Sequence, residues 1–261
     1  MNFILNILEN DYNTVLMSMT AIAVVVFIAL FYVKAGYGQF RTKGWGFSFN
    51  NKVGWVMMEF PVFLCMLLFC VTSERALMIP HFIFFIIFEI HYLQRSLIFP
   101  FLMKGKSKMP LTIILLGMIF NTVNAFMQGG WIFYVSPADY YPVSWLWSPQ
   151  FIIGTLIFFG GMYINMQSDH IIRHLRKPGD TRHYLPKGGM FNYVTSANYF
   201  GELLEWVGFA ILTWSWAGVV FAVWTFANLG PRAHAIRKSY MQQFPEEFKN
   251  RKLKRMIPFI Y

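Results

Sequence analysis

The chain has 261 residues, of which 56% are hydrophobic and only 13% are charged, and its formal net charge is +10. A mean hydropathy of +0.45 makes it far more apolar than a soluble domain of this length. These values exclude a water-soluble globular protein and predict an integral membrane protein.

Seven apolar segments account for most of the chain. A helix needs about 20 apolar residues to cross a hydrocarbon core of about 30 Å. We therefore expect an all-α integral membrane protein with seven transmembrane helices that form a single domain over residues 1–261. The predicted crossings are residues 13–33, 53–72, 77–101, 110–135, 147–168, 198–213 and 216–233.

The positive charges fall into alternate connections between these segments. Of the 22 Lys and Arg residues, 20 lie within residues 34–52, 104–108, 173–187 and 232–255, whereas the intervening connections carry acidic residues. Basic loops stay on the cytoplasmic side of a membrane. We therefore expect the N-terminus outside, the C-terminus in the cytoplasm, and a turn near residues 215–218 that separates two short helices. The charge indicates topology, and no nucleic-acid partner is expected.

The second and third predicted helices carry polar residues where the membrane lies. A carboxylate inside a bilayer is costly, so Glu59 is expected to have a functional or paired role. Glu89, Tyr92 and Arg95 are spaced by three and share one face of the third helix. An alternative for this face is a Glu89–Arg95 network that only holds helices together.

The fourth predicted helix contains three amide side chains among apolar residues, namely Asn121, Asn124 and Gln128. Amides inside membranes often form hydrogen bonds between helices, worth only about 0.6 kcal/mol each. We interpret these three as structural.

The fifth and sixth predicted helices carry matching polar stripes, joined by a loop that contains five Lys and Arg residues. At helical spacings, the stripes comprise Asn165, Asp169, Arg173 and Arg176 on one helix and Asn198, Glu202 and Glu205 on the other. Two such stripes beneath a basic loop predict a pocket for a ligand that is both polar and anionic. A nucleotide fits this description.

Several other chemistries find no support in the sequence. No G-x-G-x-x-G, phosphate-binding P-loop or G-x-S-x-G motif is present. His170 and His174 have a spacing compatible with a metal, but they form an isolated pair without an H-E-x-x-H motif. We expect no metal.

Several motifs in one order identify a resemblance. The segments NMQSD at 165–169, LRKPG at 175–179, PKGG at 186–189 and GELLEW at 201–206 are similar to those of the steroid 5α-reductase family. These integral membrane enzymes reduce the 4,5 double bond of 3-oxo-4-ene steroids with NADPH. The segment IPFI at 257–260 supports the match, and this apolar tail is expected to fold back against the bundle.

The resemblance implies that two parts of the chain have different roles. Residues 1–135 are expected to form the substrate side, and residues 136–261 the cofactor-binding region. Glu59 and Tyr92 match the catalytic pair that contacts the steroid 3-oxo group, with Trp55 and Met58 beside them as substrate-binding residues. The expected NADPH-binding residues are Tyr37, Arg95, Lys106, Asn165, Asp169, Arg173, Arg176, Tyr184, Asn198, Glu202, Arg232, Arg237 and Tyr240.

The chain departs from the family pattern at two places. Met58 stands before Glu59 where the family commonly has glutamine, which affects the inferred steroid preference. After Arg232 the sequence reads Ala233-His234-Ala235 rather than a histidine cluster. No histidine role is transferred there.

The chemistry implied by the resemblance requires a hydrogen-bond donor. Hydride addition to the β-carbon of an enone leaves negative charge on the ketone oxygen, and a donor aimed at that oxygen stabilises it. Tyr92 can donate directly. Glu59 is either protonated or accepts the Tyr92 hydroxyl and holds it in place.

Other functions stay open at this point. Enoyl-CoA and polyprenol reductases of the same superfamily share the nucleotide half, and an isoprenylcysteine-type methyltransferase would bind S-adenosylmethionine instead. A transporter or receptor is a third possibility. The expected partners are a steroid and membrane lipid, with no obligate protein partner. The expected location is the endoplasmic reticulum of a eukaryote or the inner membrane of a bacterium, with the cofactor side cytoplasmic.

Overall fold

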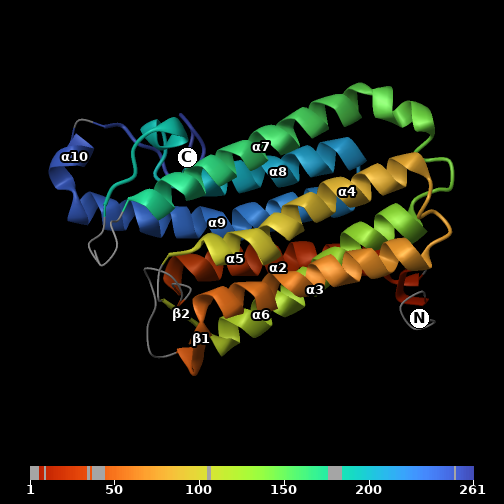
Figure 1. Cartoon of the computed structure of the whole chain (residues 1–261), viewed down its shortest axis with the longest axis horizontal. Coiled ribbons are helices and arrows are strands. Elements are labelled where there is room, and N and C mark those ends of the chain that lie inside the picture. Colours follow the sequence, from red (N-terminus) through yellow and green to blue (C-terminus); the bar gives the residue numbers. More distant parts are fainter. Residues whose placement is uncertain are drawn as a thin grey trace.

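The computed structural model describes residues 6–8, 10–33, 36, 45–104, 107–175, 184–249 and 251–261. Long helices run side by side along the molecule (Figure 1). The longer helical elements are α2 (Tyr12–Tyr32), α3 (Asn51–Thr72), α4 (Ile79–Leu93), α6 (Leu111–Gly130), α7 (Pro149–His174), α8 (Ala197–Thr213) and α9 (Trp216–Gln243). The shorter ones are η3 (Gln94–Ile98), α5 (Phe99–Leu102), η4 (Trp131–Val135), η5 (Val143–Trp147), η6 (Gly189–Asn192) and α10 (Pro245–Lys249).

Five of the helical segments are long and apolar enough to cross a membrane. They are Tyr12–Tyr32, Asn51–Thr72, Ile79–Leu102, Leu111–Val135 and Pro149–His174. The two remaining predicted crossings also form helices, but α8 has 17 residues, which extend over about 26 Å. The second half of α9 is polar. The structure thus confirms a mostly helical protein with five helices that are long and apolar enough to span a membrane.

The predicted turn between the last two helices is present. Trp214 adopts a left-handed conformation with φ of 46° directly after α8. Ser215 then starts α9, because its Oγ accepts a hydrogen bond from Gly218 N at 3.0 Å. The chain therefore reverses direction between α8 and α9.

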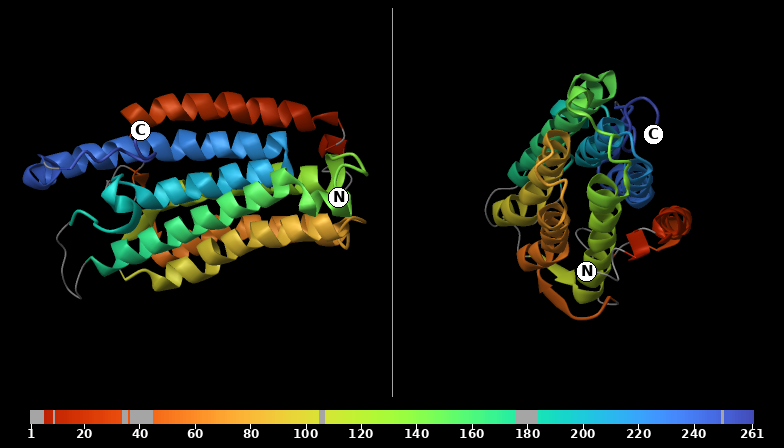
Figure 2. Two further views of the ribbon diagram at one scale, coloured as in Figure 1. Left: turned by 90° about the horizontal axis from the view of Figure 1, so that it is seen from above. Right: turned by 90° about the vertical axis from the view of Figure 1, so that its right-hand side faces the viewer.

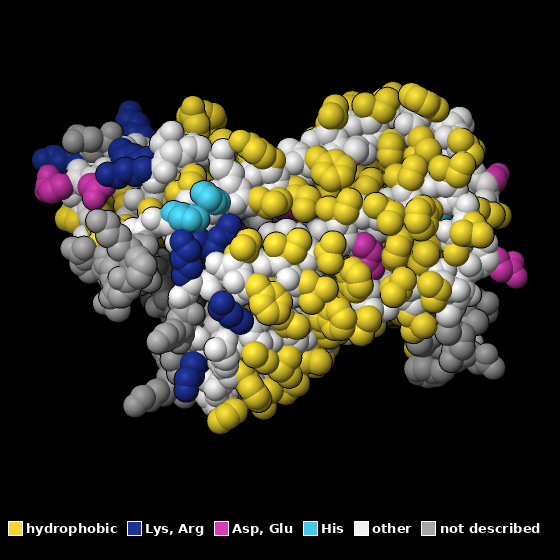
Figure 3. Space-filling model, viewed as in Figure 1, with side chains coloured by type: hydrophobic (Ala, Val, Ile, Leu, Met, Phe, Trp, Pro, Cys, Tyr) yellow, Lys and Arg dark blue, Asp and Glu magenta, His cyan; other side chains and the backbone are white. Residues whose placement is uncertain are grey.

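The two ends of the bundle differ in charge. The described N-terminal residues lie at one end, whereas the C-terminal tail, α10 and the small sheet lie toward the other (Figure 1). On the face shown in Figure 3, Lys and Arg side chains gather at the end that carries the C-terminus, and hydrophobic side chains cover most of the remainder. This distribution agrees with the charge pattern of the sequence.

A two-stranded sheet joins two of the basic connections, and the all-α expectation missed it. β1 (Ser48–Asn50) pairs in antiparallel fashion with β2 (Lys108–Pro110), with Phe49 opposite Met109. Strands of three residues are too short to show an alternating pattern in the sequence. The sheet fixes the start of α3 beside the start of α6.

Glycines set the close approach of α7 and α8. A Cβ on Gly201 would lie 2.4 Å from Asn165 N, and one on Gly161 would lie 2.6 Å from Glu205 N. Gly154 of α7 and Gly208 of α8 make the same kind of contact seven residues away, each against the backbone of the other helix. The two helices therefore touch through their backbones, and the polar residues next to these glycines are brought together.

A π-helical turn in η3 positions Arg95. Phe99 N donates to Gln94 O, which is the i to i+5 bond of a π-helix. Pro100 has no N–H to bind the carbonyl of Ser96, and the Ser96 hydroxyl donates to Tyr92 O at 2.5 Å. Gln94, Arg95 and Ser96 are consecutive and all buried. The predicted crossing at residues 77–101 is thus a continuous helical segment, Ile79–Leu102, that contains one π-helical turn.

The outer helix α2 packs mainly on α9 (Figure 2). Trp224 Nε1 donates to Met19 O at 2.7 Å, and Phe27 stacks on Phe226 with ring centroids 5.8 Å apart. Of the five apolar helices, α2 is the least buried within the protein.

The C-terminal tail folds back as predicted. Lys254 N donates to Tyr193 O at 2.9 Å, and Met256 is fully buried against Leu229 and Ala233 of α9. The tail therefore covers the junction between α9 and the segment before α8.

Candidate active site

Three amides of α6 connect the predicted catalytic residues, and we call Asn121, Asn124 and Gln128 the amide cluster. Asn121 Nδ2 donates to Glu59 Oε2 at 3.0 Å and to Met58 O at 2.9 Å. Asn124 Nδ2 donates to the Tyr92 hydroxyl oxygen at 2.8 Å. Asn121 and Asn124 are one turn apart on α6 and thus neighbours on its surface. They bring Glu59 and Tyr92 to adjacent places.

The direction of these hydrogen bonds fixes what the Tyr92 hydroxyl does. Gln128 Nε2 donates to Asn124 Oδ1 at 3.4 Å and to Ala217 O at 3.0 Å, so the Asn124 amide nitrogen faces Tyr92. Since the Tyr92 oxygen accepts from Asn124, its own proton is available to another acceptor. Tyr92 is 2% exposed and lies against Phe88 and Trp206. The result is a buried, oriented hydroxyl donor.

The amide cluster forms hydrogen bonds to α3, α4 and α9, as the structural interpretation of these three residues predicts. Two of its members also contact the predicted catalytic residues Glu59 and Tyr92 directly. The spacing of the amides by three and four residues on an otherwise apolar helix was the available signal. What the sequence could not show was which helix faces them.

The predicted substrate-binding residues Trp55 and Met58 precede Glu59 on α3. Met58 packs closely over Gly117 of α6, where an added Cβ would meet its Cγ. The guanidinium carbon of Arg95 lies 4.8 Å from the centre of the Trp55 ring and 4.7 Å from that of Phe99. Such contacts of a cation with an aromatic face are attractive. Trp55 therefore stands between the substrate-side residues and Arg95.

A second group of polar residues lies where η3, α7 and α8 meet. We call Arg95, Asp169, Asn198 and Glu202 the ionic cluster. Arg95 Nη1 is 3.5 Å from Asp169 Oδ2, and Arg95 Nη2 is 3.8 Å from Glu202 Oε2. Asn198 Nδ2 donates to Asp169 Oδ1 at 3.4 Å. The arrangement places one cation between two carboxylates.

Asn165 completes the contact between the two polar stripes. Its Nδ2 donates to Asn198 O at 2.9 Å, beside the backbone contact of Gly201 with Asn165. The prediction that the stripes of the two helices face one another is confirmed. Arg95, which belongs to the third predicted helix, also contacts these residues. The predicted division at residue 135 therefore places Arg95 in one part of the chain and the other members of the ionic cluster in the other part.

Glu205 departs from its stripe and faces α4 instead. Its Oε2 lies 2.7 Å from His91 Nδ1, and the two side chains are 1% and 5% exposed. The two side chains share one hydrogen bond. His91 also packs edge-on to Tyr92 and Trp206. The pair therefore holds α4 to α8 directly beside Tyr92.

The alternative Glu89–Arg95 network is absent from the described part of the chain. Arg95 pairs with Asp169 and Glu202, whereas neither carboxyl oxygen of the buried Glu89 has a hydrogen-bond partner among the described residues. The π-helical turn separates the two side chains.

The remaining predicted cofactor residues lie along the same end of the bundle. Arg232 Nε donates to the Tyr199 hydroxyl at 2.6 Å, which ties α9 to α8. Arg237 Nε donates to Leu253 O at 2.8 Å and thereby faces the C-terminal tail. Tyr240 follows one turn later and Tyr184 directly precedes the buried Leu185, while Arg173 is half-exposed one turn beyond Asp169. Tyr37, Lys106 and Arg176 lie outside the described residues.

Histidines do not assemble a metal centre in the described part of the chain, where no group of three or more potential ligands occurs. The rings of His170 and His174 stack with centroids 4.1 Å apart, and His174 Nδ1 bonds to His170 O rather than pointing toward a shared ion.

Comparison with known proteins assigns the chain to a family. A family model described as "3-oxo-5-alpha-steroid 4-dehydrogenase" matches residues 107–261. The chain is 41% identical to "3-oxo-5-alpha-steroid 4-dehydrogenase 1" of Bos taurus, over 92% of this chain and 93% of the relative. It is 37% identical to "Steroid 5-alpha-reductase DET2" of Arabidopsis thaliana, over 90% of each chain. Both the family model and the whole-chain identities lead to one conclusion, that the chain belongs to the 3-oxo-5-alpha-steroid 4-dehydrogenase family.

Proposed function

We propose that the protein reduces the 4,5 double bond of 3-oxo-4-ene steroids to 5α-dihydro steroids with NADPH. Family membership makes it an oxidoreductase acting on CH–CH groups, and the names of the relatives give the substrate class. The observation that carries the proposal is the Tyr92 hydroxyl, which is buried and accepts a hydrogen bond from Asn124. Its proton is therefore available to the steroid 3-oxo oxygen.

Tyr92 and Glu59 would act together on the substrate side. Tyr92 donates to the ketone oxygen and stabilises the negative charge that develops there. Asn121 holds one carboxyl oxygen of Glu59, which keeps this side chain next to Tyr92. Glu59 supports the donor either as a protonated acid or by accepting from Tyr92 in the free enzyme. Trp55 and Met58 would border the steroid.

The ionic cluster fits a dinucleotide. The buried Asp169 Oδ2 lies 3.5 Å from Arg95 Nη1 but accepts no hydrogen bond from the described residues, and a buried acceptor of this kind gains from an added donor. Hydroxyl and amide groups of a dinucleotide can supply such donors. Asn165, Asp169, Asn198 and Glu202 would orient these groups, while Arg95, Arg173, Arg232 and Arg237 are candidates for the phosphates. When bound, NADPH supplies the hydride that the β-carbon of the enone accepts.

The other predicted cofactor contacts belong to the same proposal. Tyr184 and Tyr240 lie near the basic end of the bundle, and Tyr37, Lys106 and Arg176 are proposed on the family resemblance. Arginine clamps favour NADPH over NADH, because a guanidinium binds the 2′-phosphate. Residues 1–135 would supply most of the substrate side and residues 136–261 most of the cofactor side, with Arg95 linking them.

The proposed topology has seven transmembrane helices, with the N-terminus outside and the C-terminus in the cytoplasm. Its support is the gathering of basic side chains at the C-terminal end (Figure 3) together with the positive-inside rule. In this topology the cofactor end is cytoplasmic. The membrane would be the endoplasmic reticulum of a eukaryote or the inner membrane of a bacterium.

The direct test is incubation of detergent-purified protein with NADPH and a 3-oxo-4-ene steroid, with the product identified by mass and stereochemistry. We expect a 5α-dihydro product and stoichiometric cofactor oxidation. Oxidation of NADPH only with an enoyl-CoA or a polyprenol derivative would contradict the proposed substrate. Binding of S-adenosylmethionine in place of NADPH would contradict the proposed reaction.

The roles of Tyr92 and Glu59 are tested by Tyr92→Phe and Glu59→Gln. Loss of a comparable oxyanion donor lowers the rate by about 10²–10³, so both variants should lose most turnover while NADPH binding is largely retained. Tyr163→Phe is a matched control, because the exposed Tyr163 hydroxyl also bonds an amide, that of Gln167, at 2.9 Å. Normal turnover by Tyr92→Phe would rule out the assignment.

A further inference from the structure

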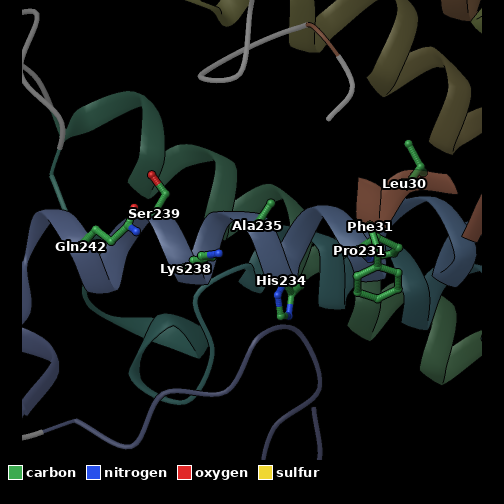
Figure 4. A pocket seen from close by; sticks show the side chains of 8 residues that line it. All are labelled: Leu30, Phe31, Pro231, His234, Ala235, Lys238, Ser239 and Gln242. Atoms are coloured by element: carbon green, nitrogen blue, oxygen red, sulfur yellow. The ribbon is translucent and has the colours of Figure 1, made fainter. Parts of the chain in front are cut away.

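A groove separates the C-terminal end of α2 from the part of α9 that follows Pro231. It encloses about 320 Å³, and Figure 4 shows the side chains that line it. Leu30, Phe31 and Pro231 form one half, and Lys238, Ser239 and Gln242 form the other, with His234 between them. The groove shares no lining residue with the amide cluster, the ionic cluster or the predicted cofactor-binding residues. Its α9 residues alternate along the helix with Arg232, Arg237 and Tyr240, so the experiment below also measures NADPH binding.

The polar half presents hydrogen-bond donors. Arg255 Nε donates to His234 Nδ1 at 3.0 Å, so the proton of a neutral His234 is on Nε2, the nitrogen left to donate. Gln243 Nε2 donates to Ser239 Oγ at 2.7 Å, so the Ser239 hydroxyl proton is available as well. Lys238 adds an ammonium group. Among the described residues, no acidic side chain lines the groove. This donor set is complementary to an anion with several oxygens, such as a phosphate.

The apolar half is continuous with the lipid-facing side of α2. Phe31 packs edge-on to His234 with ring centroids 5.7 Å apart, while Ile28 and Tyr32 are 54% and 84% exposed on the same helix end. A ligand that fills both halves therefore needs an anionic head and an apolar chain. A free nucleotide or inorganic phosphate has the anionic group but no apolar chain.

We propose that this α2–α9 groove binds an anionic phospholipid, with the head-group phosphate against Lys238, Ser239 and His234 and an acyl chain along Leu30 and Phe31. The bound lipid bridges α2, the least buried of the apolar helices, to α9. In the proposed topology the lipid comes from the cytoplasmic leaflet. Clusters of basic residues at the cytoplasmic ends of membrane helices are suited to such head groups.

The test uses the full-length protein in nanodiscs of phosphatidylcholine with or without phosphatidylglycerol, followed by native mass spectrometry of retained lipid. Wild-type protein should retain phosphatidylglycerol in preference to phosphatidylcholine. Lys238→Gln should weaken this preference by about tenfold, because a charge-assisted hydrogen bond is lost. Lys252→Gln removes the same charge from an exposed site outside the groove and should leave the preference unchanged.

A second variant tests the groove without altering charge. Ala235→Phe places a ring in the groove, which Ala235 lines, and should also abolish the preference for phosphatidylglycerol. Retention of phosphatidylglycerol by both variants at the wild-type level would overturn the proposal. So would a Lys238→Gln protein that keeps its lipid but binds NADPH more weakly, since the groove would then serve a soluble phosphate compound.

Discussion

The amide cluster and the ionic cluster are neighbours in one bundle but differ in chemistry. The amide cluster uses neutral side chains, and its hydrogen bonds to Tyr92 and Glu59 are 2.8 and 3.0 Å long. The ionic cluster uses charges at longer separations, 3.5 and 3.8 Å from Arg95 to its two carboxylates. Neutral amides orient a hydroxyl without burying a charge. Loosely paired charges can rearrange around an incoming ligand.

Under the proposed function, this difference means that the amide cluster is oriented before the steroid binds and that the ionic cluster is completed by NADPH. Each link of the amide cluster has a defined donor and acceptor, ending in the proton of Tyr92. In the ionic cluster, Asp169 Oδ2 still lacks a hydrogen-bond donor among the described residues. Substitutions in the first cluster should therefore change kcat, and substitutions in the second should change the KM for NADPH.

The largest effect on stability is expected from Gly201→Ala, which disrupts the packing that holds the ionic cluster together. Its Cβ would lie 2.4 Å from Asn165 N, a backbone atom that cannot move without shifting α7. Overpacking of this kind costs about 1–3 kcal/mol or more. We expect a thermal unfolding temperature lowered by several degrees and NADPH binding weakened by at least about tenfold. Thermal unfolding in detergent and NADPH titration measure both.

Gly160→Ala is the matched control for this substitution. A Cβ on Gly160 meets nothing within 4 Å, and alanine favours a helix by about 1 kcal/mol over glycine. This variant should be as stable as wild type or slightly more so. If Gly201→Ala and Gly160→Ala behaved alike, the close approach of α7 and α8 would not support the ionic cluster.

The sequence was sufficient to predict the helices and the contact of the two polar stripes. Long apolar runs give helix positions with little ambiguity. α3 begins and ends within two residues of its predicted crossing, and α6 together with η4 covers Leu111–Val135 against a predicted 110–135. The break between α8 and α9 was predicted because the basic connections on both sides of these helices belong on the same side of the membrane, which requires an even number of crossings between them. Asn165, Asp169, Asn198 and Glu202 were predicted together because their spacing places them at the ends of consecutive helices.

Features that depend on contacts between distant helices were missed. Nothing local in the sequence shows that Asn121 faces Glu59, a residue 62 positions away. The π-helical turn at Gln94–Ile98 depends on Pro100 and on the environment of Arg95. Glu205 has the spacing of the α8 stripe, but its side chain contacts the buried His91 of α4 instead. Sequence periodicity identifies a helical face and leaves its partner undetermined.

The next largest effect is expected from Asn124→Leu, which removes the bond to Tyr92 while keeping a side chain of similar size. Gln128 still has Ala217 O as a partner, so the main change is a Tyr92 hydroxyl that is no longer oriented. We expect kcat to fall by about tenfold, equivalent to about 1.4 kcal/mol, with an unchanged KM for NADPH. Steady-state kinetics with varied NADPH separate the two parameters.

Gln167→Leu serves as the control for Asn124→Leu. It removes an amide–tyrosine hydrogen bond of 2.9 Å on the exposed side of α7, far from Tyr92 in the bonding network. Its kcat should remain at the wild-type value. An equal loss of kcat in both variants would indicate general destabilisation rather than orientation of Tyr92.

The smallest effect is expected from Asp169→Asn, which tests the ionic cluster by removing one charge and keeping the shape. Arg95 retains Glu202 as a partner, and the amide oxygen of asparagine can still accept a hydrogen bond. Loss of the negative charge weakens the hydrogen bonds that NADPH donates to this side chain. The KM for NADPH should therefore rise by about three- to tenfold with little change in kcat. Asp139→Asn, at an exposed position of the opposite end, should change neither value. A fall in kcat at constant KM would show that the ionic cluster acts on the chemical step, and the contrast with the amide cluster would then be wrong.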